Sequence, residues 1–141
     1  MREILFRGQY LNGSNWGIGN LVYSEQGNPY IIPKEIVKQD GHHLKIYEDE
    51  PFWVDKETVG QYIGVIDDNG VKVFDGDIVK MSYGGDKWVS RVSWFGGGFC
   101  VKVADFFGHD YDYMYVEDMM GLDIEHIKVI GNIYDNKNLL K

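Results

Sequence analysis

The sequence predicts an all-β protein, because its composition and its local patterns both favour short strands. Glycine accounts for 18 of the 141 residues, proline for only 3, and aromatic residues for 15%. This mixture is typical of many strands connected by tight turns. Asn69-Gly70 and Asp75-Gly76 lie between β-branched and aromatic residues, as turn residues between strands do. Later segments alternate apolar and polar residues, which indicates strands with one buried face.

The stretch Val54–Val79 has the clearest succession of strands and turns. Asp68-Asn69-Gly70 separates two strand-like runs, and Asn-Gly favours the type I′ turn, in which two successive residues have positive φ. Asp75-Gly76-Asp77 then interrupts the pattern before Ile78–Tyr83 resumes it. Glycine supplies backbone freedom there, and aspartate supplies an acceptor for nearby amides. We therefore expect three strands separated by two turns.

The first third of the chain predicts further strands. Ile4–Leu11 and Trp16–Tyr23 are strand-like and flank the turn cluster Asn12–Asn15, so they predict an opening hairpin. Tyr30–Ile32 is a short strand, and the following Pro33 has no amide hydrogen to donate. That proline favours an edge position for the strand.

After Val79 the alternation places Trp88, Val92 and Trp94 on one strand face, and we expect Val92 and Trp94 in the core. Gly96–Gly98 joins this run to the next strand. The run Ile127–Ile133 has apolar residues on both faces, which is typical of a central strand. Together the strands predict a small, bent SH3-like barrel with additional N-terminal strands and only short helical turns. No repeat or linker divides the chain, so we expect a single domain over residues 1–141.

A longer pattern runs through these turns. It comprises Asp55-x-x-Thr58-x-Gly60-Gln61-Tyr62-x-Gly64, then Asp67-x-Asn69-Gly70, Gly76-Asp77 and, near the end, Gly131-Asn132 with Asn136. This pattern resembles the YopX family of phage and prophage proteins, and the resemblance covers most of the chain apart from roughly 104–125. Ile63 departs from it, since many members have threonine there. The resemblance implies a mostly β, phage-encoded protein, and the family has no motif of catalytic residues to carry over.

Charge and cysteine content restrict the partners and the compartment. The chain has 22 acidic and 14 basic residues, a net charge of −8, which disfavours direct binding to the phosphates of nucleic acid. The single Cys100 lies between Phe99 and Val101, so we expect a buried thiol in a reducing compartment, the host cytoplasm. The N-terminus lacks the apolar region of a signal peptide, and no run is long enough to span a membrane.

The segment 105–126 carries seven acidic residues and no lysine or arginine, so it supplies −7 of the net charge. It is also rich in aromatic residues, and Tyr115–Gly121 is expected to form one or two helical turns. More aromatic side chains are present than a small barrel readily shields, and exposed aromatics mark interfaces. We therefore predict an interaction surface formed by Phe106, Phe107, His109, Asp110, Tyr111, Asp112, Tyr113 and Tyr115.

Candidate chemistry is sparse. His109, Asp110 and Asp112 offer nitrogen and oxygen ligands to a divalent metal, but no metal-binding spacing such as HExxH accompanies them. Cys100 has apolar neighbours on both sides and no nearby base to activate it as a nucleophile. The aspartates of the turns are expected to cap the backbone. We predict that the protein is not an enzyme and needs no cofactor.

Three functions remain as hypotheses. The first is a non-enzymatic phage or prophage accessory protein that acts by protein–protein interaction or self-assembly, as a homo-oligomer or with a phage or host protein. Its contacts would involve the aromatic segment or an exposed edge strand such as Tyr30–Ile32. The second is an acidic decoy that binds a basic site on a nucleic-acid-binding protein. The third is a metal-dependent enzyme that uses His109, Asp110 and Asp112.

Overall fold

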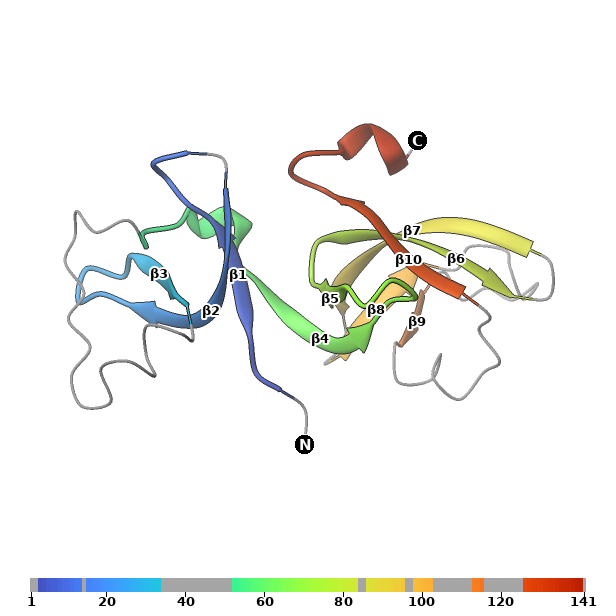
Figure 1. Cartoon of the computed structure of the whole chain (residues 1–141), viewed down its shortest axis with the longest axis horizontal. Coiled ribbons are helices and arrows are strands. Elements are labelled where there is room, and N and C mark those ends of the chain that lie inside the picture. Colours follow the sequence, from blue (N-terminus) through green and yellow to red (C-terminus); the bar gives the residue numbers. More distant parts are fainter. Residues whose placement is uncertain are drawn as a thin grey trace. The chain divides into compact units, whose positions relative to one another are not determined.

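The computed structural model describes residues 3–13, 15–33, 52–83, 86–95, 98–102, 113–115 and 126–140 (Figure 1). In chain order the elements are β1 (Phe6–Gln9), β2 (Trp16–Tyr23), β3 (Pro29–Ile32), η1 (Lys56–Thr58), β4 (Gly60–Ile66), β5 (Lys72–Phe74), β6 (Asp77–Tyr83), β7 (Asp86–Phe95), β8 (Gly98–Lys102), β9 (Tyr113–Tyr115), β10 (His126–Asn132) and η2 (Lys137–Leu140). Both η elements are short 3-10 helices, and no α-helix occurs in these ranges. The all-β class is confirmed.

The strands form two five-stranded sheets, ordered β3-β2-β1-β4-β5 and β10-β6-β7-β8-β9. By contacts the chain divides within β4 into two compact units, Met1–Tyr62 and Ile63–Lys141. A single functional domain over residues 1–141 stays a prediction. None of the helices in the part of the chain that the structure describes is long and apolar enough to cross a membrane.

The first unit is a ring of extended segments. The predicted opening hairpin is present, since β1 pairs antiparallel with β2, and β3 pairs with the other edge of β2. The segment 52–55 completes the ring. The amide of Ile31 donates to the carbonyl of Phe52, and the amide of Leu11 donates to the carbonyl of Trp53, both at 3.0 Å. The same short segment thus contacts β3 on one side and the end of β1 on the other.

Glycine is required at positions of the ring where other segments approach the backbone closely. Gly8 lies opposite Gly17 in the β1–β2 register, and a Cβ at Gly8 would lie 2.9 Å from the side chain of Val54. A Cβ at Gly19 would meet the carbonyl oxygen of Ile32. Any side chain at Gly8 or Gly19 would therefore push apart the strands that close the ring.

The expected edge position of Tyr30–Ile32 is confirmed, since β3 ends the order of its sheet, but the expectation that this edge is exposed is wrong. Tyr30, Ile31 and Ile32 are fully buried. Segment 52–54 covers the edge of β3 with backbone hydrogen bonds, and Tyr30 forms an isolated bridge with Trp53. The ring of Tyr30 also stacks on that of Trp53, with centroids 6.1 Å apart. Pro33 follows the last residue of the strand, and the exposed edge that it suggested is covered by residues more than 20 positions further along the chain.

The second unit has its core on the inner faces of β4 to β8. Val92 is fully buried, which confirms its predicted place in the core. Trp94 lies opposite Phe99 in the β7–β8 register. The burial of its side chain stays a prediction, because that side chain is not among those that the structure describes. The predicted glycine-linked hairpin of β7 and β8 is present. Ile127 and Val129 pack against the core cluster. Its buried members are Ile63, Val65, Val73, Val79, Met81, Val92 and Phe99.

The prediction that the strand around Ile127–Ile133 is central is wrong, because β10 ends the order of its sheet and pairs only with β6 among the described strands. Its other edge is covered by a turn instead of a strand. The amide of Asp68 donates to the carbonyl of Ile127 at 3.0 Å, and the amide of Val129 donates to the Asp67 carboxylate at 2.9 Å. The apolar residues on both faces of β10 reflect this coverage.

Candidate functional site

The predicted interaction surface lies mostly outside the described residues. Phe106, Phe107, His109, Asp110, Tyr111 and Asp112 belong to that undescribed part. Tyr113 and Tyr115 lie in β9, which pairs with β8 so that Tyr113 faces Lys102 and Tyr115 faces Cys100 across the ladder. The surface therefore stays a prediction. The residues of the sequence pattern are described, and their side chains form three hydrogen-bonded clusters.

The first cluster fixes the turn before β4. Asp55 Oδ1 accepts a hydrogen bond from the amide of Glu57 at 3.1 Å and so caps the 3-10 helix η1. The buried Thr58 Oγ1 donates to the carbonyl of Asp55 at 2.7 Å and accepts from the amide of Gln9 at 2.8 Å. Gly60 and Gln61 then pair with β1. Asp55 and Thr58 thus attach the start of β4 to β1, 49 residues away in the chain.

The second cluster is organised by Asp67, at the turn between β4 and β5. Its Oδ1 accepts from the amides of Asn69 at 2.9 Å and Val71 at 2.8 Å, and its Oδ2 accepts from the amide of Val129 at 2.9 Å. The residue is buried. One carboxylate therefore holds the hairpin turn and the edge of β10 together.

The hydrogen bonds of the β4–β5 turn show that the predicted turn type is wrong. The amide of Gly70 donates to the carbonyl of Asp67, and the amide of Asp67 donates to the carbonyl of Val71. The turn is therefore centred on Asp68 and Asn69, with Gly70 as the following residue at φ +80°. This is the three-residue hairpin with a glycine bulge, instead of a two-residue turn centred on Asn69-Gly70.

The ionisation of Asp67 follows from this geometry. Burial raises the pKa of the Asp67 carboxyl, but the amides of Val129, Val71 and Asn69 and the positive charge of Lys128 outweigh it, so the pKa lies below its usual value. Hydrogen bonds to the charged form stabilise the carboxylate. Both oxygens already accept backbone hydrogen bonds, so Asp67 is a weak base that is suited to holding structure.

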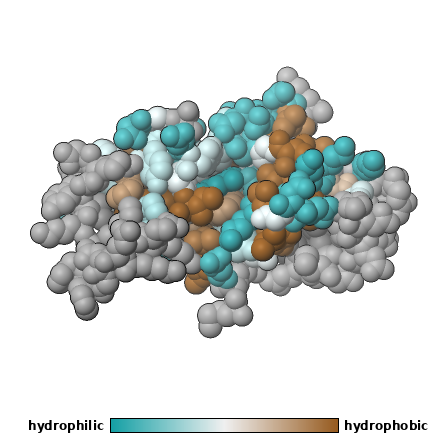
Figure 2. Space-filling model, in the orientation of Figure 1, coloured by the Kyte–Doolittle hydropathy of each residue, from teal (hydrophilic) through white to brown (hydrophobic). Residues whose placement is uncertain are grey.

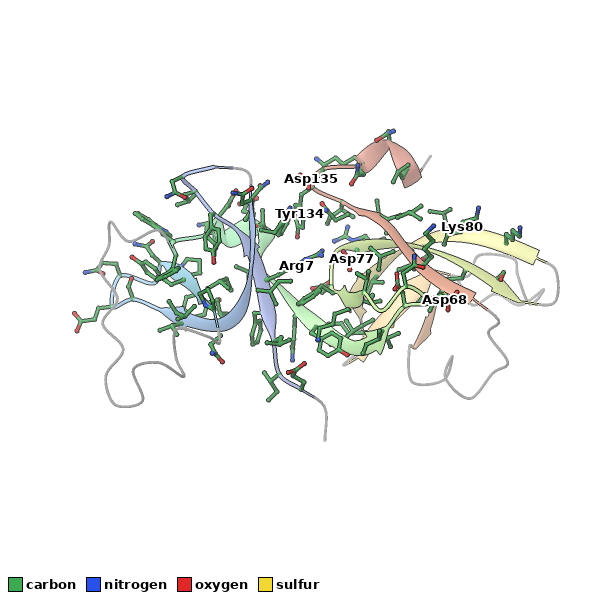
Figure 3. The ribbon with its side chains drawn as sticks, viewed as in Figure 1. Arg7, Asp68, Asp77, Lys80, Tyr134 and Asp135 are labelled. Atoms are coloured by element: carbon green, nitrogen blue, oxygen red, sulfur yellow. The ribbon has the colours of Figure 1, made fainter. Side chains whose placement is uncertain are left out.

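The third cluster joins the β5–β6 turn to the end of β10. Asp77 is buried, and its Oδ2 accepts from the amide of Phe74 at 2.8 Å, as predicted for an aspartate beside a glycine turn. Gly76, at φ +93°, donates its amide to the carbonyl of Val92 and accepts from the amide of Ile133, both at 2.9 Å. Figure 3 labels Asp77 and Tyr134, whose ring lies 3.2 Å from the position of a Cβ on Gly76.

Asn132 and Asn136 cap the chain beyond β10. Asn132 Oδ1 accepts from the amides of Tyr134 at 3.0 Å and Asp135 at 2.9 Å. Asn136 Oδ1 in turn accepts from the amide of Asn132 at 3.2 Å. A Cβ on Gly131 would lie 2.6 Å from Asn136 Oδ1, which explains glycine at that position. These short polar side chains accept hydrogen bonds from backbone amides that have no partner strand at the end of β10 and beyond it.

Cys100 has the environment that the sequence predicts. It is buried as a thiol, and burial raises the pKa of that thiol. Its Sγ lies 3.7 Å from the carbonyl oxygen of Gly98. A thiol with a raised pKa is mostly protonated near neutral pH and is therefore a poor nucleophile.

The sequence alone does not show one feature of these clusters. Asp67 is expected there as a local turn residue, whereas its Oδ2 accepts from the amide of Val129, 62 residues away. Among the described residues, no group of three or more His, Cys, Asp or Glu side chains lies together as metal ligands would. The candidate ligands His109, Asp110 and Asp112 fall outside those residues.

Comparison with known proteins gives the same fold. A family model described as YopX protein matches residues 16–141. The structure resembles the crystal structure of protein EF1440 from Enterococcus faecalis, with a TM-score of 0.56, 19% identity and 100% of both chains covered. It also resembles the X-ray structure of YopX from Bacillus subtilis, with a TM-score of 0.57, 21% identity and 100% of both chains covered. No curated protein matches the sequence.

Proposed function

Since the chain belongs to the YopX family, we propose that it is a non-enzymatic accessory protein of a phage or prophage that acts by protein–protein interaction or self-assembly. The observation that carries this proposal is how the pattern residues are used. Asp55, Asp67, Asp77 and Asn132 all accept hydrogen bonds from backbone amides. The residues of the sequence pattern thus hold turns in place. Contacts with a partner would be made by other residues at the surface.

The proposal extends to the architecture of the second unit, for which we propose a small bent barrel of the SH3-like kind. The β4–β5 hairpin supports it, because Asp67 and Asp68 in its turn hydrogen-bond to β10, the edge strand of the other sheet. Gly76 supports it as well, since its amide and carbonyl bond to β7 and to the residue after β10. Small barrels of this kind bind partners through their surfaces, and their fold alone names no reaction.

We propose the bacterial cytoplasm as the place of action. The buried Cys100 supports this compartment, because it is the single cysteine of the sequence and cysteines remain thiols in reducing surroundings. The phage association rests on the family resemblance.

Static light scattering over a dilution series tests self-assembly. A mass that rises with concentration toward a defined multiple of 16.3 kDa is expected, since soluble homo-oligomers generally close with point-group symmetry. A monomer mass at every concentration and salt level would reject self-assembly and leave binding of another protein. Metal analysis of the purified protein tests the enzymatic alternative: stoichiometric metal that is lost from a His109→Ala variant would overturn the proposal.

The acidic stretch favours one second candidate, a decoy for a basic site. The segment 105–126 has seven acidic residues and no lysine or arginine, so it carries the dense negative charge that a nucleic-acid-binding site attracts. Affinity capture from infected cells tests this, with a variant whose acidic residues between 105 and 125 are changed to amides as the control. Salt-sensitive capture of a nucleic-acid-binding protein by the native chain alone would favour the decoy over the accessory role.

A further inference from the structure

A basic patch lies on the second unit of this acidic protein. Lys80 in β6 lies directly opposite Lys128 in β10 and directly opposite Val89 in β7. Lys87 and Arg91 are two residues from Val89 on either side, so their side chains leave β7 on the same face. All of these residues are exposed. Lys80, Lys87, Val89, Arg91 and Lys128 are called the basic face below.

The strand positions of the basic face hold no acidic residue. They are 128 in β10, 78, 80 and 82 in β6, and 87, 89 and 91 in β7, and none is aspartate or glutamate. Ile78 and Ser82 are buried, so the exposed part of the face consists of the three lysines, Arg91 and Val89. In Figure 3 Lys80 lies on β6 beside β10, and Figure 2 shows a hydrophilic surface at that place. Neighbouring strands are about 4.8 Å apart and residues about 3.3 Å apart along a strand, so the face extends roughly 10 Å by 13 Å.

Holding Lys80 opposite Lys128 costs stability, because like charges directly across a ladder repel each other. Lys128 is partly compensated by the nearby charge of Asp67. No salt bridge within the described residues joins Lys80, Lys87 or Arg91 to a carboxylate. An anionic partner would relieve this repulsion, and the exposed Val89 would add a small apolar contact at the centre.

The chain itself contains the matching anion. Its segment 105–125 carries seven acidic residues and no lysine or arginine. It also has several aromatic residues, which can pack against Val89. Without that segment the net charge is close to zero, so charge is separated between two parts of one sequence. Nucleic acid fits less well, because no basic-face residue is aromatic and stacking is a main source of single-strand affinity. The net charge of −8 also opposes phosphate binding.

We propose that the basic face binds the acidic segment 105–125 of a second copy of this chain. This inference rests on the self-assembly that is proposed above and names the surfaces that would carry it. The charged contacts lie at the rim of such an interface and set its specificity and orientation. The aromatic residues of the segment supply the apolar part.

Charge reversal tests the pairing. Lys80→Glu with Lys128→Glu changes the face, and Asp110→Lys with Asp112→Lys changes the segment. Each variant alone is expected to dissociate roughly tenfold more readily than the native chain, because two attractions become repulsions. Lys56→Glu with Lys137→Glu is the matched control, since both lysines are exposed and lie outside the face. The control is expected to assemble as the native chain does.

Mixing the two variants decides whether the contact joins two copies. The acidic face of one variant then meets the basic segment of the other, so assembly with native affinity is expected only in the mixture, with one copy of each. Analytical ultracentrifugation with one variant fluorescently labelled measures this directly. Circular dichroism of each variant, compared with the native chain, confirms folding before the result is used.

The remaining outcomes separate this inference from the proposed function. Oligomers that keep native affinity in both charge-reversed variants would overturn the inference and leave self-assembly standing. A native chain that is monomeric throughout would overturn both. Anisotropy with a fluorescein-labelled DNA duplex provides the last comparison: binding that Lys80→Glu with Lys128→Glu abolishes, without any effect on oligomers, would assign the face to nucleic acid and overturn the inference.

Discussion

Replacing Asp67 tests how the second unit is held together. In Asp67→Ala three backbone amides, those of Asn69, Val71 and Val129, lose their acceptor. A hydrogen bond to a charged group contributes about 1.5–3 kcal/mol, and a buried donor without a partner costs a similar amount. Residues 68–71 of this turn are exposed, so solvent can offset part of the loss, and we expect a total decrease of about 3–5 kcal/mol in the free energy of unfolding. That is a large share of the stability of a typical domain.

Asp67→Asn separates the contribution of one of these bonds. The amide oxygen can keep the two bonds within the turn, but the NH2 group then faces the amide of Val129, a donor against a donor. We expect a loss of about 2 kcal/mol, smaller than for alanine. Asp68→Asn is the matched control, because it removes the same charge from the next, exposed residue. It is expected to change stability by less than about 0.5 kcal/mol.

Urea unfolding followed by tryptophan fluorescence measures these differences, and native chain and variants must be compared at one protein concentration because assembly adds to stability. The pH dependence provides an independent check. The pKa of Asp67 is lowered in the folded state. The carboxylate therefore contributes its full stabilisation at pH values above the pKa of an unfolded aspartate, about 3.9, and this stabilisation is lost as the pH falls through the pKa of the folded state. The advantage of the native chain over Asp67→Asn should therefore shrink below about pH 4. An alanine variant that loses less than about 1 kcal/mol would refute the role assigned to Asp67.

Three further substitutions test single features. Gly70→Val should cost about 1–2 kcal/mol, because Gly70 has φ +80° and open space around its Cβ, whereas Gly13→Val, with equal space and no positive φ, should cost less in the same thermal melts. Val92→Ala should cost about 2–3 kcal/mol in urea unfolding, because Val92 is fully buried, and Val89→Ala on the same strand should be almost neutral. Thr58→Val should cost about 1–3 kcal/mol, because the Gln9 amide loses its acceptor while the side-chain shape stays; Thr58→Ser, which keeps the hydroxyl, should recover most of it.

The sequence predicts the turns well, because turn chemistry is local. Asp77 accepts from the amide of Phe74, three residues away, and Gly76 has the positive φ that a glycine turn allows. The alternation around Val92 likewise reports its own burial. A short pattern therefore predicts where such turns lie, and the β4–β5 and β7–β8 hairpins follow from it, although the β4–β5 turn is centred on Asp68 and Asn69 instead of Asn69 and Gly70.

The long-range contacts could not be predicted in the same way. Hydrophobic alternation shows that a strand is buried, and it does not show what covers it. Pro33 suggested an exposed edge at Tyr30–Ile32, although segment 52–54 covers that edge. The apolar residues on both faces of β10 suggested a central strand, although β10 is an edge strand that Asp67 and Asp68 cover. The predicted interaction surface between Phe106 and Tyr115 depends on such tertiary information as well, and it stays a prediction.

Net charge is likewise a poor guide to the partners of this protein. A value of −8 for the whole chain argues against binding anions only if the charges are evenly mixed. Here seven acidic residues are concentrated in segment 105–126, and the β10-β6-β7 register brings Lys80 and Lys128 to one face. Electrostatic attraction between exposed groups is screened beyond about 8–10 Å at ordinary salt. A partner therefore responds to the local patch, and an acidic protein with a basic face is suited to binding an acidic segment of its own kind.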